Sequence, residues 1–223
     1  MLDARRQLFR GAAGLAACLG LLFCGQATAQ QRFIQMALAD GFDFPVGAPN
    51  AEGYYKSRGL RLVPPLHFGE DWNGRGGGDT DLGDPVYATG DGVVTWAYDV
   101  QRSWGKVVMI RHAYRDPATR QVKYCDSLYG HLLDIRVRVG AMVKRGQRIG
   151  SIGTANGIYP AHLHFEIRHN IRIGMARESA ARGPENWADP TEFITRYRRL
   201  NREWSKVPVE TGTYEEYQGF KGL

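Results

Sequence analysis

The residues with the clearest chemical potential are two histidines separated by a single leucine. His162 and His164 lie in the segment HLHFE, which also contains Glu166. Residues two apart in a strand project from the same face, so these three polar side chains share one face and their apolar neighbours share the other. We expect the apolar face to pack on a core. On the exposed face, one histidine can reach a metal while the other stands beside whatever the metal binds.

Two further potential metal ligands lie earlier in the chain. His67 and Asp71 are four residues apart in HFGED, close enough for one short segment to present both. Pro64 and Pro65 precede them and favour an extended approach rather than a helix. Zinc takes imidazole and carboxylate ligands, and a catalytic zinc site commonly has three protein ligands and one position for water. The donor types therefore indicate a catalytic zinc (Zn2+) site.

A fifth residue completes a pattern that is shared with a known family. His131 lies in YGHL, between HFGED and HLHFE. The order HxxxD, YxHL and HxH, with the glycine-punctuated segments DGVVTWAY and VGAMVKRGQRIGSIG, resembles the zinc endopeptidases of the lysostaphin and LytM type, peptidase family M23. The resemblance runs from about Phe44 to DPTEF near residue 190. It implies a mainly β fold, a compact antiparallel β-sheet peptidase domain, duplicated-hybrid or barrel-like, with a short C-terminal helix.

The resemblance also implies a role for each of the five residues. His67, Asp71 and His164 would be the zinc ligands, and His131 and His162 would be the two catalytic histidines. The implied reaction is hydrolysis of peptide cross-links of bacterial peptidoglycan, with zinc-activated water as the nucleophile and the two histidines assisting. The sequence has no HExxH segment and so no glutamate base of that other zinc peptidase class, which leaves proton transfer to histidine.

Several alternatives stay open at this point. The sequence does not say which histidine is the base, or whether the bond cut is glycine–glycine or D-alanine–diaminopimelate. A non-catalytic relative would bind the cell wall or activate an amidase, but its signature would be loss of site residues, and all five are present. The glycine spacing is also similar to that of a biotinyl or lipoyl carrier, but the methionine-flanked lysine of such a carrier is absent.

Other residues near these motifs have structural interpretations. Glu166 either orients a ligand imidazole or is a solvated strand residue. Glu70 stands where the family has an apolar residue. How the side chains around this position pack is therefore an open question. We expect structural or surface roles for His112 and His169. A solvated, glycine-rich loop that lacks the EF-hand spacing is expected to hold three aspartates, Asp79, Asp81 and Asp84.

The N-terminal residues have the composition of a secretory signal peptide. Three arginines precede an apolar stretch, residues 11–25, and the small-residue segment ATA ends at Ala29. We predict cleavage after Ala29 and export to the periplasm or the exterior, with no transmembrane span in the mature form. The arginine pair also resembles a twin-arginine signal. A lipoprotein box ending at Cys18 is a further alternative, but it would leave an apolar run where a polar linker is usual.

The cysteine content limits the possible disulfides, and the net charge limits the possible binding partners. Signal cleavage would leave Cys125 as the one cysteine, which we expect to be a buried small hydrophobe in a chain without disulfides. The net charge of the whole chain is +6, and a mildly basic protein suits an anionic cell wall. The basic cluster in residues 136–148 has no interleaved aromatics, so nucleic acid is not an expected partner. The sequence does not indicate an oligomeric state.

We divide the chain into a signal peptide (1–29), a lead-in segment (30–60), a peptidase domain (61–200) and a C-terminal tail (201–223). The lead-in is expected to be a strand and a loop rather than an inhibitory domain, and the tail from Ser205 shows no periodicity. Glycine-bounded apolar runs predict four strands, Val93–Tyr98, Lys106–His112, Asp126–Leu133 and Ala161–Ile167.

One helix is predicted near the C-terminus. Asp189 can cap it, Pro190 occupies the first turn, and Glu192 follows at the third position. Four apolar side chains then recur at helical spacing and are expected to pack on the core, namely Phe193, Ile194, Tyr197 and Leu200.

Overall fold

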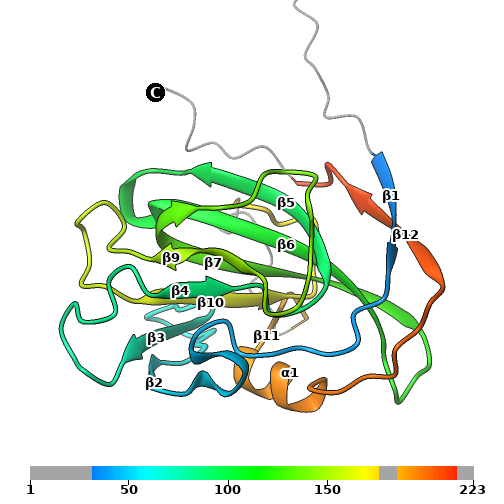
Figure 1. The fold of residues 1–223 in the computed structure, drawn as a ribbon, viewed down its shortest axis with the longest axis horizontal. Helices are drawn as coiled ribbons and strands as arrows, with labels where there is room; N and C mark the ends of the chain where they lie inside the picture. Colours follow the sequence, from blue (N-terminus) through cyan, green and yellow to red (C-terminus); the bar gives the residue numbers. More distant parts are fainter. Residues whose placement is uncertain (1–31, 176–184, 215–223) are drawn as a thin grey trace, which may run out of the picture.

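The computed structural model describes residues 32–175 and 185–214 and is dominated by one antiparallel sheet (Figure 1). Within these ranges ten strands join in the order β2-β3-β10-β7-β6-β5-β8, with β11 pairing with β10 and β9 pairing with β4 and β7. The predicted signal peptide, residues 1–29, lies outside the described residues. The strands of this sheet are β2 (Tyr54–Arg58), β3 (Glu70–Gly74), β4 (Pro85–Tyr87), β5 (Gly92–Asp99), β6 (Lys106–Arg115), β7 (Val122–Ile135), β8 (Met142–Val143), β9 (Arg148–Ile152), β10 (Leu163–Arg168) and β11 (Trp187–Ala188).

The four strands expected from the sequence are confirmed as β5, β6, β7 and β10. The two central strands, β6 and β7, are longer than predicted, since β6 ends at Arg115 and β7 begins at Val122. Their alternating apolar residues enter the main core, which also receives side chains from β4, β8, β9 and the C-terminal helix. The predicted mainly β, antiparallel fold is therefore confirmed.

Strand β10 differs from its expectation in one respect. Leu163, Phe165 and Ile167 face the core as predicted. The opposite face was expected to be exposed, yet His164 and Glu166 on it are buried too. Aromatic side chains cover this second face, because Trp104 packs edge-on against the His164 ring and Trp187 donates to Glu166.

The predicted helix is confirmed as α1 (Pro190–Arg196). The Asp189 side chain accepts a hydrogen bond of 2.9 Å from the Glu192 backbone N–H, and Pro190 occupies the first turn. Phe193 and Ile194 are buried in the main core. In addition to α1, the described residues contain two single-turn elements, η1 (Gly47–Ala51) and η2 (Arg102–Trp104). No helix of the described ranges has the length and apolar character that crossing a membrane requires.

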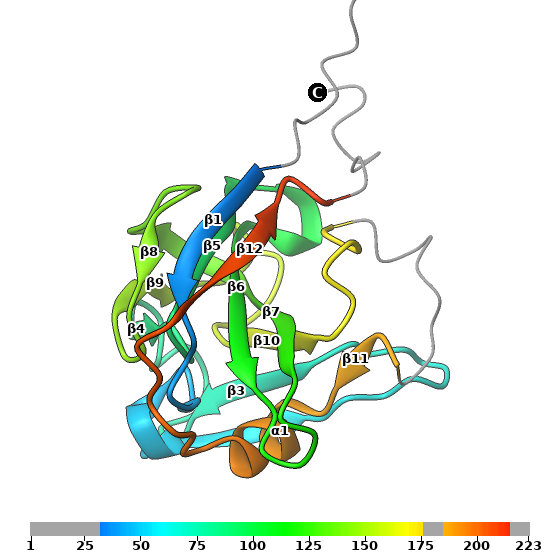
Figure 2. The same ribbon diagram turned by 90° about the vertical axis from the view of Figure 1, so that its right-hand side faces the viewer.

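The two ends of the described chain form a separate two-stranded ribbon, which faces the viewer in Figure 2. Strand β1 (Arg32–Ala37) pairs antiparallel with β12 (Lys206–Thr211). The lead-in is thus a strand and a loop, as expected, but the expectation of a tail without regular structure from Ser205 is wrong. Val209 of β12 is fully buried against Met36 and Val93, so side chains that alternate in this tail pack on the sheet.

Candidate metal centre

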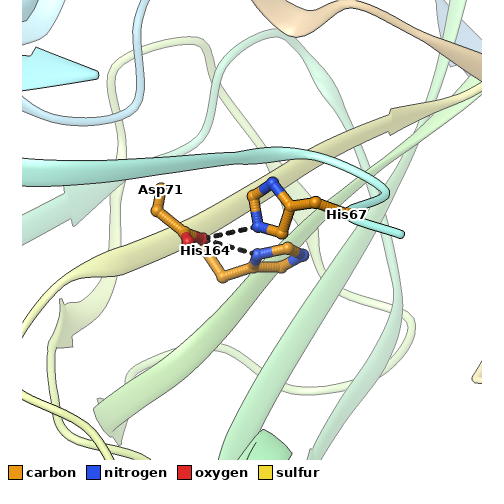
Figure 3. Close-up of side chains that lie close together, drawn as sticks. All are labelled: His67, Asp71 and His164. Carbon is orange, nitrogen blue, oxygen red and sulfur yellow. Dashed lines mark hydrogen bonds and ion pairs between the residues drawn. The ribbon is translucent and has the colours of Figure 1, made fainter. Parts of the chain in front are cut away.

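Three of the sequence-predicted site residues meet at the junction of β3 and β10 (Figure 3). Asp71 of β3 pairs directly with His164 of β10. Directly paired residues of an antiparallel sheet project from the same face, so the two side chains lie side by side. His67 precedes β3, and a backbone bridge with Arg61 fixes its position over the same face. The sheet register therefore brings together residues that are far apart in the sequence.

The potential ligand atoms of these three residues converge. His67 Nε2 lies 3.0 Å and His164 Nδ1 lies 2.8 Å from Asp71 Oδ1. One potential ligand atom from each residue lies within 4.8 Å of the other two, and all three residues are buried. Two imidazoles and one carboxylate are a donor set that zinc prefers, and three protein ligands match a catalytic site.

The outer nitrogen of each imidazole is held by an oxygen that can only accept. His67 Nδ1 lies 2.8 Å from the Gly59 carbonyl, and His164 Nε2 lies 2.8 Å from Glu166 Oε1. These acceptors assign the proton of each neutral ring to its outer nitrogen. A neutral ring then faces the Asp71 carboxylate with a lone pair, so a positive charge must lie between them, either a proton on the inner nitrogen or a metal ion. The hydrogen-bonding pattern therefore fits a shared metal ion.

The charges at the centre lower the pKa of its carboxyl group and raise the pKa of one imidazole. Burial alone would raise the pKa of Asp71, but hydrogen bonds from His164 and His67 outweigh it and hold this pKa well below its usual range. Burial would lower the pKa of His164, yet its contacts with Asp71 and Glu166 raise it. Both directions show that the Asp71 carboxylate attracts positive charge to this point.

A buried carboxylate lies directly behind His164. Glu166 Oε1 accepts from His164 Nε2, while Oε2 accepts from Arg168 Nε at 2.7 Å and from Trp187 Nε1 at 3.1 Å. Burial would raise the pKa of Glu166, but Arg168 and His164 hold it far below its usual range. The solvated alternative for Glu166 is wrong, and its contacts are those of a residue that orients an imidazole.

The remaining two histidines stand beside this centre. His162 Nε2 lies 3.8 Å from Asp71 Oδ1, and the His131 and His162 ring centroids are 4.8 Å apart. His131 Nδ1 lies 3.2 Å from the Trp104 carbonyl, and His162 Nδ1 lies 2.8 Å from the Pro160 carbonyl. In each neutral ring the basic nitrogen is therefore Nε2. Burial, followed by the positive charges of His164 and His162, lowers the pKa of His131 to about 3.

An unusual backbone conformation positions His131. Its φ is +64°, in the left-handed region that non-glycine residues seldom adopt. Strand β7 pairs with β10 as far as Gly130 and with β9 from Leu132, so His131 lies where the strand changes partners. The pairing of β7 with β6 also shifts register across this point. Such local distortions commonly re-aim a side chain at a functional site.

These residues line one open cleft. Its volume is about 390 Å³, and the side chains of His131 and His162 border it together with the three potential metal ligands. Further residues on its walls are Ser57, Arg58, Leu66, Asn73, Ser103, Trp104, Tyr159 and Pro160. Its size lies within the range of small-molecule and peptide sites. The structure thus places all five sequence-predicted residues in one cleft, while their individual roles stay a prediction.

Comparison with known proteins identifies the domain. The sequence of residues 66–174 matches the family described as Peptidase family M23. All five residues fall within this span. These residues form an M23 peptidase domain.

Two relatives that the chain resembles are named for different functions. The chain is 32% identical over 149 residues to the murein hydrolase activator EnvC of Escherichia coli (strain K12). The match covers 64% of this chain and 30% of EnvC. The chain is 34% identical over 110 residues to the peptidoglycan DD-endopeptidase ShyB of Vibrio cholerae serotype O1, covering 48% of this chain and 21% of ShyB. The chain therefore spans less than a third of either relative.

A solved structure shows the same fold. This chain is similar to a chain of the SpoIIQ-SpoIIIAH pore forming complex, with a TM-score of 0.50 and 20% sequence identity. The likeness covers 71% of this chain and 93% of that chain. At this identity the match concerns the fold alone.

Sequence reasoning missed how the M23 domain uses Glu70. This carboxylate is fully buried and accepts from Lys56 Nζ at 2.7 Å, from Thr191 Oγ1 at 2.7 Å and from Trp72 Nε1 at 3.1 Å. It joins β2, β3 and the first turn of α1, which resolves the question of local packing. Lys56 and Thr191 come from other elements, so no local motif of the sequence indicates these contacts.

The acidic loop of the M23 domain is also better anchored than expected. Residues 75–80, Asp79 among them, are exposed as predicted, but the prediction of a solvated carboxylate is wrong for Asp81. Asp79 Oδ1 accepts from the Ala161 backbone N–H at 2.7 Å, and Asp81, which is buried, accepts from the Gly74 N–H at 2.9 Å. These bonds tie the loop to the start of β10 and the end of β3, so it supports the walls of the cleft.

Residues expected to have structural roles do have them. Cys125 is a free, fully buried cysteine, and burial raises the pKa of its thiol. His112 is buried, donates from Nδ1 to the Asp91 carbonyl at 2.9 Å and accepts from Ser127 Oγ at 2.7 Å. His169 is exposed, with its ring centroid 6.1 Å from that of Phe193, which is the surface position allowed for it. None of these three residues borders the described cleft.

Proposed function

We propose that this chain is a zinc-dependent endopeptidase that hydrolyses peptide cross-links of bacterial peptidoglycan. One observation carries the proposal: three zinc-type donor atoms within 4.8 Å of one another share a cleft with two further histidines in an M23 domain. His67, Asp71 and His164 hold the metal through Nε2, a carboxylate oxygen and Nδ1. When bound, zinc lowers the pKa of a water ligand towards about 7 and polarises the scissile carbonyl.

The chain itself supplies the groups that move protons. His131 and His162 each have Nδ1 held by a backbone carbonyl, so Nε2 is free to accept a proton from the attacking water. The same imidazole can then return that proton to the leaving amine. The second histidine can donate a hydrogen bond to the developing oxyanion once Nε2 also carries a proton, a state that the lowered pKa of His131 disfavours for that residue. The two roles are not assigned between His131 and His162.

Replacement of either histidine by alanine tests this division of labour. We expect His131→Ala and His162→Ala to bind zinc at the wild-type stoichiometry, because neither ring is one of the three ligands. Turnover should fall by about 10²- to 10⁴-fold, the usual contribution of a positioned acid or base. Zinc content and cleavage rate, measured on the same samples, show whether each histidine acts in catalysis or binds the metal. A variant that loses its zinc would show that a ligand has been misassigned.

A second candidate function is activation of a separate wall hydrolase. The likeness to EnvC, which is named a murein hydrolase activator, favours it. Such a protein has no need of a complete catalytic set, whereas all five residues are present in this cleft. We therefore rank the activator second.

Digestion of purified peptidoglycan separates the two functions. Zinc-loaded and chelator-treated mature protein, with His131→Ala as the inactive control, would be incubated with walls of both cross-link types, and product masses recorded. Release of peptide fragments that requires zinc and His131 is the expected result, and the masses would identify the bond. Full zinc occupancy with no cleavage of either wall would favour the activator.

We also propose that the chain is exported and cut after Ala29. Peptidoglycan lies outside the cytoplasmic membrane, so the proposed substrate requires export. N-terminal sequencing of the protein from a periplasmic or medium fraction should find Gln30 as the first residue. A lipidated N-terminus at Cys18 would be the contrary result.

A further inference from the structure

One row of residues crosses the floor of the cleft from the edge of the sheet. Arg58 of β2 pairs with Asp71 of β3, Asp71 pairs with His164 of β10, and His164 pairs with Gly130 of β7. Paired residues share a face. The Arg58 guanidinium therefore lies beside the donor set, on the strand that ends this sheet.

A bulge in β2 brings Arg58 to this face. Tyr55 pairs with Asn73 and Lys56 with Trp72, so a regular ladder would set Ser57 opposite Asp71. The register instead shifts by one residue, and Arg58 takes that place. A one-residue shift exchanges the two faces of a strand. Ser57 Oγ secures the bulge through contacts of 3.0 Å with the Asp71 carbonyl and 2.6 Å with Asn73 Oδ1.

The Arg58 side chain retains its hydrogen-bonding capacity. Its Nη1 lies 3.5 Å from Asp71 Oδ2, an ion-pair distance, and 59% of the side chain is exposed. Within the described residues it donates no hydrogen bond. The buried Arg111, in contrast, directs Nε and Nη2 at the two oxygens of Asp126, at 2.7 and 2.8 Å. The Arg58 fork is thus available to a ligand in the cleft.

The charge of the cleft favours an anion. Among the described residues that line it, Asp71 is the sole acid and Arg58 the sole lysine or arginine. A divalent cation held by two neutral imidazoles and Asp71 leaves a net positive charge, to which the guanidinium adds another. Positive clefts attract and orient anionic ligands.

From this geometry we propose that Arg58 binds a free carboxylate of the peptide substrate, next to the bond that is cut. Arginine and carboxylate form paired, charge-assisted hydrogen bonds. Arg58 lies against a proposed metal ligand, and one residue of extended peptide spans about 3.3–3.6 Å. The carboxylate therefore belongs to a residue at or adjoining the scissile bond.

The inference rests on the proposed endopeptidase and narrows its substrate. A glycine–glycine bridge carries no carboxylate at this place. A cross-link to diaminopimelate carries one on the residue that donates the amine. Arg58 thus favours the second type of bond and gives the enzyme a means of rejecting the first.

Matched peptides test the assignment without relying on turnover. Two cross-linked peptides, each with an N-methylated and hence uncleavable scissile amide, would differ only in bearing a carboxylate or a carboxamide beside that bond. Dissociation constants would be measured by calorimetry for zinc-loaded wild type, Arg58→Gln and Arg58→Lys. The control is Arg138→Gln, an exposed arginine outside the cleft.

We expect wild type and Arg138→Gln to bind the carboxylate peptide at least about tenfold more tightly than the carboxamide, as a charge-assisted pair allows. Arg58→Gln should bind both equally, and Arg58→Lys should recover part of the preference because it keeps the charge. Equal affinities in wild type, or a preference that survives in Arg58→Gln, would overturn the proposal. So would loss of zinc from Arg58→Gln, which would make Arg58 a support for Asp71.

Cleavable versions of the same peptides separate this inference from the proposed function. Hydrolysis of both at equal kcat/KM would leave the endopeptidase in place and overturn the role of Arg58. Hydrolysis of neither, together with an Arg58-dependent preference in binding, would overturn the endopeptidase and leave the carboxylate site standing.

Discussion

Glu166 decides how firmly His164 is held towards the metal. In Glu166→Gln the shape is kept, but the charge that faces the His164 N–H and the Arg168 guanidinium is lost. We expect zinc affinity to fall by about 10- to 100-fold, as for other groups that orient ligand imidazoles. Competition with a chromophoric chelator measures the zinc affinity of wild type and variant. Glu52→Gln, an exposed glutamate, is the control, and equal affinities in the two variants would refute the role.

His112 gives the fold a defined dependence on pH. Burial lowers its pKa from 6.5 to about 4. Below about pH 6.5 the unfolded chain takes up a proton that the folded chain refuses until about pH 4. The free energy of unfolding therefore falls as the pH falls through this window, by about 3 kcal/mol from this residue.

Urea unfolding between pH 7 and pH 4, with chelator present, tests this dependence. In His112→Gln the other histidines still titrate, but the contribution of residue 112 is absent. The free energy of unfolding should consequently fall less steeply in the variant than in wild type. Parallel curves would show that His112 does not titrate as its burial requires.

At the residue scale the chemistry was largely visible in the sequence. Imidazoles and a carboxylate in the order His67, Asp71 and His164 predicted a donor set that the structure does bring together. The place of Arg58 could not be predicted, because it depends on a bulge that no motif records. Glu70 was equally hidden, since its partners Lys56 and Thr191 come from other elements.

Among the elements, α1 depends on its cap. Asp189 accepts the Glu192 N–H that would otherwise have no partner within the helix. Asp189→Ala should lower the free energy of unfolding by about 1 kcal/mol, and Asp189→Ser should restore most of it. Urea titration at neutral pH measures both variants. If alanine and serine were equally destabilising, the loss would come from something other than the cap.

Elements that carry strong signals in their own residues could be predicted from the sequence. Elements that form only by pairing with a distant strand could not. Asp189, Pro190 and the apolar spacing after them mark α1 without reference to the rest of the chain. Strand β12 carries only Val207 and Val209 in alternation, with Pro208 between them. A proline cannot donate to a ladder, which argues against a strand. Pairing with β1, distant in sequence, creates the element.

At the scale of the whole molecule, the β1–β12 ribbon is held to the sheet by buried valine. Val209 packs against Met36 and Val93 and is fully buried, whereas Val207 is only partly buried. Val209→Ala should lower the free energy of unfolding by about 2 kcal/mol, and Val207→Ala by less than half as much. Thermal and urea unfolding compare the two. Equal, negligible losses would mean that the ribbon does not contribute to the fold.

The ribbon has a topological consequence as well. Arg32 and Thr211 are direct partners, so the polypeptide enters and leaves the described domain at one point. A unit whose two ends adjoin can be inserted into a longer polypeptide without forcing the host segments apart. The same geometry makes the domain suitable for circular permutation. A short linker could join the ends, and new termini could be opened in an exposed turn such as the one around Gly140, away from the cleft.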